Sequence, residues 1–259
     1  MHIVITGASS GIGAALAREL STLPNAKLTL VARRKSLLEE LARSLPCEVT
    51  VVERDLSKGD DSTTDWLPED VDVLVNNAGV QVIGRTSSID VDKGEASVEL
   101  NLLAPLRLTR KVLPSMLARR SGVIVDIASM AALAPTPGMT YYNASKAGLA
   151  AASEALRGEL RGTGVHVVTV YPGIVQTDMA DAGLAAYGSN IALRLQPRGT
   201  TAGLAAIVKH AILRKHARIV YPRSYFFVRW FGPVVRWFMD RFAPALAETN
   251  GTNEAVRAS

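Results

Sequence analysis

Short apolar runs alternate with amphipathic stretches along most of this chain. The apolar runs predict buried strands at residues 2–5, 27–32, 48–52, 71–75, 122–129, 164–171 and 217–221. Helical periodicity falls between them, at residues 14–20, 35–43, 89–120 and 202–213 and in a helix that carries Tyr142 and runs to about residue 161. Strands that are apolar on both faces and alternate with helices form parallel sheets. The pattern predicts an α/β fold, with a single doubly wound parallel sheet and helices on both faces.

The alternation continues to residue 221 without an internal linker, which predicts one domain over residues 1–221. With 259 residues and 48% apolar content the chain can bury a large core, although length alone does not separate one domain from two. Residues 243–259 are small and polar, and we expect a disordered tail there. Residues 222–242 differ from both neighbouring segments in their content of aromatic and arginine residues.

Aromatic and arginine side chains are concentrated in this extension. Residues 221–242 hold nine of the fourteen aromatic residues of the chain. At 100° per residue, Arg229, Arg236 and Asp240 fall on one stripe and most aromatics lie opposite, which predicts an amphipathic helix with a kink at Pro233. Such a helix suits a membrane interface, a hydrophobic substrate channel or an oligomer contact, or it covers the core of its own domain. The sequence leaves these four readings open.

Charge and cysteine content exclude several classes of function. The net charge of +5 reflects 29 basic against 24 acidic residues, a mild excess, so we expect no nucleic-acid partner. The single cysteine, Cys47, excludes a disulfide framework and a cysteine-based metal site, and the four histidines are scattered, so we expect no metal. The chain enters a strand at once and holds no run of 18 apolar residues. We expect a cytoplasmic protein, with peripheral membrane attachment through residues 222–242 as the open alternative.

A glycine-rich turn links the first predicted strand to the first predicted helix. Gly7, Gly11 and Gly13 follow residues 2–5 directly and open an amphipathic run. Glycines let the backbone approach a pyrophosphate, whose charge then lies against unpaired N–H groups and the positive end of the helix dipole. The strand, turn and helix therefore predict a dinucleotide site.

Two arginines stand at the end of the second predicted strand, where a dinucleotide fold meets the adenosine ribose. An acidic residue there selects NAD, whereas arginine accommodates a 2′-phosphate. Arg33 and Arg34 are present, and the first carboxylate after them is Glu39. The sequence therefore favours NADP(H) over NAD(H).

Tyr142 and Lys146 lie four residues apart on one helix face, so the ammonium can lower the proton affinity of the phenol. Tyrosine alone titrates near ~10 and needs such a neighbour for acid–base work near neutral pH. Ser129 ends the fifth predicted strand and can converge on the pair. Asn101 lies among leucines, either as a buried hydrogen-bonding residue or at a bend, and Pro105 frees its carbonyl oxygen to hold a water.

Six motifs in order resemble the short-chain dehydrogenase/reductase family. They are Thr6-Gly7-x3-Gly11-Ile12-Gly13, Asn76-Asn77-Ala78-Gly79, Asn101, Ser129, Tyr142-x3-Lys146 and Pro172-Gly173-x3-Thr177. The resemblance covers residues 1 to about 221. It implies a Rossmann domain that moves hydride between NAD(P) and a carbonyl or alcohol.

The resemblance also implies a role for each site residue. Tyr142 would be the general acid in reduction and the general base in oxidation, Lys146 would bind the nicotinamide ribose and lower the Tyr142 pKa, and Ser129 would bond the substrate oxygen. Asn101 would anchor a water that links Lys146 to solvent. The pyrophosphate would be bound by Gly7, Ser10, Gly11, Ile12 and Gly13, and the 2′-phosphate by Arg33 and Arg34. The adenine would contact Asp55 and Leu56, and the ribose Asn77, Ala78 and Gly79. The nicotinamide would contact Pro172, Gly173, Val175 and Thr177.

These features favour an NADP(H)-dependent oxidoreductase acting on a small hydrophobic carbonyl or secondary alcohol. Residues 183–198 have no firm period and are expected to form a substrate lid, and we expect a homo-oligomer. The alternatives are a noncatalytic NADP-binding regulator and a membrane-associated scaffold on the same fold. The complete set of Asn101, Ser129, Tyr142 and Lys146 favours catalysis, because a sensor has no need of proton-transfer residues.

Overall fold

Parallel strands form the central layer of the computed structural model, which describes residues 1–59, 64–187 and 196–242. Within these residues seven strands make one sheet, in the order β3-β2-β1-β4-β5-β6-β9. The strands are β1 (His2–Thr6), β2 (Lys27–Ala32), β3 (Glu48–Glu53), β4 (Val73–Asn76), β5 (Gly122–Ile127), β6 (Val165–Pro172) and β9 (Arg218–Tyr221). All the pairings between them are parallel. The strand order reverses between β1 and β4, the point at which such sheets bind ligands.

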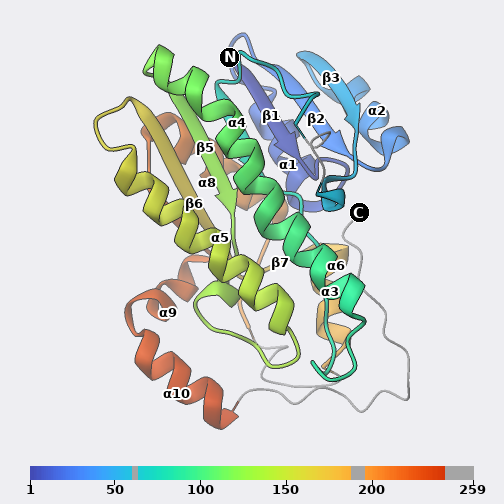
Figure 1. Cartoon of the computed structure of the whole chain (residues 1–259), viewed down its shortest axis with the longest axis vertical. Helices are drawn as coiled ribbons and strands as arrows, with labels where there is room; N and C mark the ends of the chain where they lie inside the picture. The colour runs from blue at the N-terminus through green and yellow to red at the C-terminus, as the bar shows by residue number, and fades with distance from the viewer. Residues whose placement is uncertain (60–63, 188–195, 243–259) are drawn as a thin grey trace.

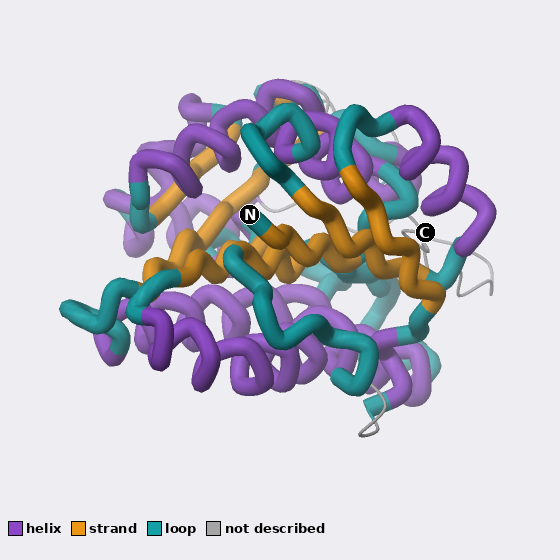
Figure 2. Tube along the Cα trace, turned by 90° about the horizontal axis from the view of Figure 1, so that it is seen from above, coloured by secondary structure: helices purple, strands orange, loops and turns teal. Residues whose placement is uncertain are grey.

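Helices cover both faces of the sheet, and Figure 2 shows the sheet between two helical layers. One core cluster joins the sheet to α1 (Gly11–Leu20), α2 (Lys35–Ser44) and α8 (Thr201–Arg214). Another joins the opposite face to α4 (Ala104–Arg119) and α5 (Thr140–Glu159), and α3 (Val91–Val98) packs beside α5. The predicted fold class, a doubly wound parallel sheet, is confirmed.

The position of each strand in the sheet explains which of its residues are buried. Every residue of β1 is buried, because β2 and β4 flank it and helices cover both its faces. At the edge, β3 alternates between exposed and partly buried residues. The predicted strands agree with the seven strands of this sheet to within about two residues at each end.

The prediction of one long helix at residues 89–120 is wrong in one respect. A π-helical turn, η3 (Glu99–Leu103), separates α3 from α4. The Ala104 N–H donates to Glu99 O, a spacing of five residues instead of four. Pro105 has no N–H to offer to the Asn101 carbonyl, so the regular ladder cannot continue through this point. The extra residue in the turn changes which side chains face the core.

The C-terminal extension is also not one kinked helix. After β9 come a short turn, η5 (Arg223–Tyr225), and two helices, α9 (Phe226–Trp230) and α10 (Gly232–Phe242). The break falls at Phe231, two residues before Pro233. Proline has no N–H to donate back into α9 but suits the first turn of a new helix, so a second helix begins instead of a kink. The predicted tail at residues 243–259 lies outside the described residues.

The predicted lid contains some regular structure. α6 (Asp178–Ala185) occupies its beginning, and β8 (Arg198–Gly199) pairs in parallel with β7 (Ile174–Val175) at its end. Residues 188–195 lie outside the described part of the chain. The end of the predicted lid is therefore hydrogen-bonded to β7, the short strand that follows β6.

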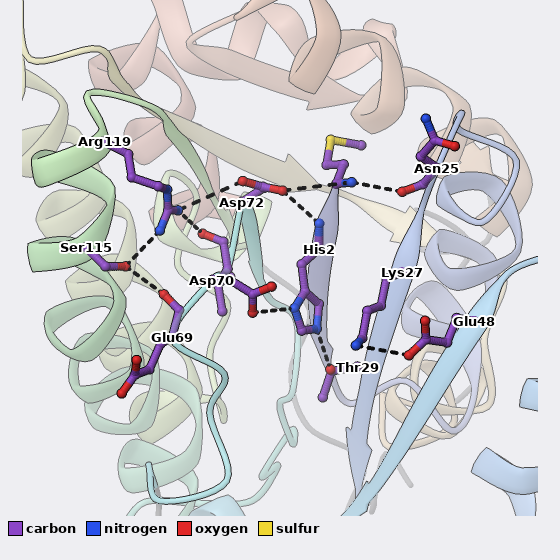
Figure 3. A network of polar contacts seen from close by, with 12 residues as sticks. His2, Asn25, Lys27, Thr29, Glu48, Glu69, Asp70, Asp72, Ser115 and Arg119 are labelled. Atoms are coloured by element: carbon purple, nitrogen blue, oxygen red, sulfur yellow. Dashed lines mark hydrogen bonds and ion pairs between the residues drawn. The ribbon is translucent and has the colours of Figure 1, made fainter.

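Polar contacts join the amino ends of the strands, at the edge opposite the glycine-rich turn (Figure 3). His2 is 6% exposed, and its Nδ1 lies 2.8 Å from Asp70 Oδ1 while its Nε2 lies 2.8 Å from Thr29 Oγ1. The His2 backbone N–H donates to Asp72 Oδ2 at 2.8 Å, and Arg119 of α4 lies 3.9 Å from the same carboxylate. This network ties β1, β2 and α4 together far from the carboxyl ends of the strands, so His2 has a structural role.

Candidate active site

A cavity of about 430 Å³ opens at the carboxyl ends of the strands. Most of the residues proposed from the sequence line it, namely Gly7, Ser10, Gly11, Ile12, Gly13, Arg33, Asp55, Leu56, Asn77, Ala78, Gly79, Ser129, Tyr142, Lys146, Pro172, Gly173, Val175 and Thr177. Arg34 and Asn101 are not among the lining residues. Segments far apart in the sequence therefore converge on one site.

The glycine-rich turn has no room for side chains. Gly7 and Gly11 have φ angles of +64° and +54°, in the left-handed region that favours glycine. A Cβ at Gly7 would lie 2.7 Å from the Ala78 Cα, and one at Gly13 would lie 2.2 Å from the Gly7 carbonyl oxygen. The turn leads directly into α1, whose first residue is Gly11. Bare backbone at a helix N-terminus fits a pyrophosphate.

Asn77 and Thr6 hold this turn against the end of β4. The Thr6 hydroxyl accepts hydrogen bonds from the backbone N–H groups of Asn77 and Ala78, both at 3.0 Å. The Asn77 Nδ2 donates to the carbonyl oxygens of Thr6 at 2.9 Å and Gly7 at 3.2 Å. The side chains of Thr6 and Asn77 therefore tie the two loops together.

The two arginines after β2 lie differently. Arg33 is exposed and lines the cavity, whereas Arg34 donates from Nη2 to Ser9 Oγ at 3.2 Å. Burial and the neighbouring Arg33 lower the Arg34 pKa, and Asp178 opposes them. Sequence reasoning missed Arg54, which also lines the cavity. The β2–β3 register pairs Ala32 with Glu53, so Arg54 follows beside Arg33, which a sequence read strand by strand does not reveal.

Asp55 is fixed by its own loop. Its Oδ1 accepts from Ser57 N at 3.0 Å and Ser57 Oγ at 2.7 Å, at the start of the turn η1 (Leu56–Lys58). Burial works to raise the Asp55 pKa, but the Ser57 hydrogen bonds and nearby cations outweigh it and leave the pKa below its usual value. The carboxylate therefore stays charged and rigid at the cavity wall.

Tyr142 and Lys146 occupy one face of α5 and are 8% and 4% exposed. Burial raises the Tyr142 pKa, and a hydrogen bond with Ser129 opposes the rise. Burial lowers the Lys146 pKa to about 8, and Asp126 opposes this shift. The Lys146 ammonium donates to the Ile127 carbonyl oxygen at 2.8 Å. The four-residue spacing predicts that Lys146 lowers the Tyr142 pKa, but the lysine is held on the β5 backbone and burial dominates at the phenol.

Asn101 lies fully buried behind the cavity. Its Oδ1 accepts from Val80 N at 2.9 Å, and its Nδ2 donates to Val80 O at 2.9 Å and Ser145 Oγ at 3.1 Å. Ser145 in turn donates to the Tyr142 carbonyl oxygen at 2.9 Å. The side chain of Asn101 therefore joins the loop after β4 to the helix that carries Tyr142. Neither Val80 nor Ser145 was singled out from the sequence.

The adjacent Tyr141 and Tyr142 differ in what their rings contact. The Tyr141 ring packs on α3 at Gly94, where a Cβ would lie 2.7 Å from the ring. Tyr142 instead lines the cavity. The side chain of Asn143, the residue after Tyr142, donates to Thr136 O at 2.8 Å and secures the loop before α5.

Apolar side chains complete the cavity beyond Tyr142, and several belong to the predicted lid and to the C-terminal extension, although none was singled out as a site residue from the sequence. They are Met130, Met139, Ile174, Leu184, Tyr187, Tyr225, Val228 and Val235. The Tyr187 hydroxyl donates to Pro137 O at 2.7 Å, so its ring is held in place. Three of these residues come from the C-terminal extension, whose position relative to the cavity depends on tertiary packing.

Comparison with known proteins gives matches over most of the chain. The family model described as short chain dehydrogenase matches residues 1–187. An NADP-dependent 3-hydroxy acid dehydrogenase of Schizosaccharomyces pombe is 36% identical over 189 residues, covering 69% of this chain and 73% of the relative. A fatty acyl-CoA reductase of Mycobacterium tuberculosis is 38% identical over 199 residues, covering 69% and 64%.

Solved structures agree with these matches. A short-chain dehydrogenase from Sphingobium yanoikuyae in complex with NADPH superposes with a TM-score of 0.76 at 28% identity, covering 95% of this chain and 98% of the other. A bulky-bulky ketone specific alcohol dehydrogenase from Comamonas testosteroni gives a TM-score of 0.74 at 27% identity, covering 95% and 96%. These likenesses extend past the residues that the family model matches.

Proposed function

Because this chain belongs to the short-chain dehydrogenase family and is therefore an NAD(P)-dependent oxidoreductase, we propose that it reduces hydrophobic ketones or aldehydes with NADPH, or catalyses the reverse oxidation. The observation that carries the proposal is the convergence of Ser129, Tyr142 and Lys146 on a cavity with apolar walls. Two relatives are named as a fatty acyl-CoA reductase and a bulky-ketone alcohol dehydrogenase, which supports a large apolar substrate.

Tyr142 delivers the proton to the substrate oxygen in reduction. Burial keeps the phenol protonated, as an acid requires, and the Ser129 hydroxyl, which opposes this rise of the Tyr142 pKa, can hold the substrate oxygen beside the phenol. When the phenol gives up its proton, the nearby Lys146 ammonium stabilises the phenolate that forms. Asn101 acts as a positioning residue, because it binds the loop and helix that set this geometry.

The bound nicotinamide would supply or accept the hydride. The glycine-rich turn and the N-terminus of α1 fit its pyrophosphate, since a side chain at Gly7 or Gly13 would collide with backbone. Asp55 and Leu56 would flank the adenine, and Pro172, Gly173, Val175 and Thr177 would lie along the nicotinamide side. In this proposal Arg33 and Arg54 hold a 2′-phosphate, and Arg34 supports them through Ser9.

We expect Arg33→Ala to raise the KM for NADPH about 10- to 100-fold and to leave the KM for NADH nearly unchanged. A charge-assisted hydrogen bond of about 1.5–3 kcal/mol would be lost only with the phosphorylated cofactor. Steady-state kinetics with both cofactors measure the effect. Arg43→Ala, an exposed arginine on α2, serves as the charge-matched control. An equal loss with both cofactors would assign Arg33 to general cofactor binding.

Initial rates of NADPH consumption with a series of ketones of increasing chain length test the proposed substrate class. We expect kcat/KM to rise with each added methylene until the cavity is filled, by up to about fourfold per group from about 0.8 kcal/mol of burial. The absorbance of the reduced nicotinamide reports turnover. Preference for short polar carbonyls would contradict the proposal, and NADPH binding without turnover of any carbonyl would favour the noncatalytic regulator.

A further inference from the structure

The C-terminal extension exposes a row of large apolar side chains. Each of the six is between 52% and 70% exposed, and together they form what we call the aromatic face: Phe226, Phe227, Trp230, Phe231, Val234 and Trp237. The Phe226 ring lies tilted against Trp230 and the Phe227 ring stacks on Phe231, each pair with ring centroids 5.9 Å apart. Figure 1 shows α9 and α10 at one end of the molecule, at the lower left of the view. This face does not cover the core of its own domain, which excludes one of the four initial readings.

The opposite side of the same helices is anchored to the domain. Val228 and Val235 line the cavity. Arg229 donates to Glu154 Oε1 at 3.1 Å and lies 5.5 Å from the centroid of the Tyr171 ring. Glu154 Oε1 also accepts a hydrogen bond from the Tyr171 hydroxyl at 2.7 Å. These contacts hold α9 so that its aromatic side chains point outward.

We propose that the aromatic face docks on an anionic lipid surface. Three exposed arginines, Arg223, Arg236 and Arg241, accompany it, and Asp240 is the one acidic residue between positions 222 and 242. Tryptophan and arginine together suit the boundary between headgroups and acyl chains, where rings are buried and cations meet lipid phosphates. The proposal does not depend on the reaction catalysed, although docking would bring the cavity close to lipid.

Charge also decides between a membrane and a second copy of the chain. A twofold contact would place the same face on both subunits and so bring like-charged arginines together. An anionic surface has the opposite charge and attracts them. Among the described residues no helix is long and apolar enough to cross a membrane, and α10 with its 11 residues would extend only about 16 Å. The helices therefore lie on the surface in this proposal.

Sedimentation of the full chain with phosphatidylcholine vesicles, with and without phosphatidylglycerol, tests the proposal. We expect binding to the anionic vesicles that weakens with salt, and a loss of at least about tenfold in the triple variant Phe227→Ala/Trp230→Ala/Trp237→Ala. The control variant Val91→Ala/Leu213→Ala removes exposed apolar side chains elsewhere and should bind like the wild type. Ketone turnover and circular dichroism verify that each variant is folded.

Two results would overturn the proposal. The first is a wild-type chain that stays in the supernatant with anionic vesicles at low salt. The second is a lipid-free wild-type oligomer whose mass falls in the triple variant, measured by light scattering, because the face would then be a subunit contact. Charge reversal by Arg223→Glu/Arg236→Glu should reduce vesicle binding while the aromatic side chains remain, and unchanged binding would contradict the electrostatic part.

Discussion

Replacing Tyr142 by phenylalanine is expected to lower kcat for ketone reduction by about 10²- to 10⁴-fold, the range that a positioned general acid contributes. The change removes a single hydroxyl and keeps the ring that is 8% exposed between α5 and the cavity, so folding should persist. NADPH binding, followed by quenching of protein fluorescence, should change little. The combination of bound cofactor and lost turnover is what a missing proton donor produces.

Tyr141→Phe provides the matched control for this variant. Its ring packs on Gly94 and not in the cavity, so we expect turnover close to that of the wild type. If Tyr142→Phe kept more than about a tenth of the activity, the proton would come from another donor, and the proposed mechanism would be wrong. Ser129→Ala would then be the next variant to measure, since the Ser129 hydroxyl lines the same cavity as the phenol.

Lys146→Met is expected to lower kcat by about 10²- to 10³-fold, because the phenolate of Tyr142 would form without a neighbouring positive charge. In the wild type the Lys146 pKa lies near 8, so the ammonium is charged below that pH and lost above it. The Tyr142 pKa is raised and stays above this range. Activity in the reductive direction should therefore fall as the pH rises through about 8, and this limb should be absent in the methionine variant.

The same substitution should not destabilise the fold. The Lys146 pKa falls from 10.5 to about 8 on burial, so the unfolded chain binds more protons between these values and stability rises with pH there. The buried charge costs on the order of 3 kcal/mol at neutral pH, before relaxation of the site. Thermal unfolding at pH 7 should give the variant an equal or higher Tm. A large loss of Tm would show that Lys146 is needed for folding, and its kinetic effect would need another explanation.

Periodicity and glycine placement made most of the sheet and the phosphate turn predictable. Buried parallel strands are short apolar runs whatever their neighbours, and the left-handed backbone at Gly7 and Gly11 favours glycine. The four-residue spacing that puts Tyr142 and Lys146 on one face is a property of one helix. Local features of this kind are encoded within a few residues, so the sequence alone reveals them.

Features that depend on register or tertiary packing were not predictable. Arg54 reaches the cavity because β3 pairs with β2 in one particular register. The Tyr142 pKa depends on burial by several segments, which outweighs the neighbouring ammonium that the sequence displays. Likewise the helical spacing of α9 and α10 reveals two faces but not which of them meets the domain, a choice that the Arg229–Glu154 contact makes.

The π-helical turn before α4 limits how this protein can be engineered. Asn101 meets Val80 and Ser145 because one surplus residue in the turn rotates the helix at that point. A stabilising redesign that deleted Leu102 or Leu103 to restore a regular helix would turn Asn101 by about 100° away from these partners. A design score based on ideal geometry would reward the deletion, while the loop after β4 and the helix of Tyr142 would lose their link. Insertions and deletions in this helix therefore deserve the caution usually kept for substitutions of catalytic residues.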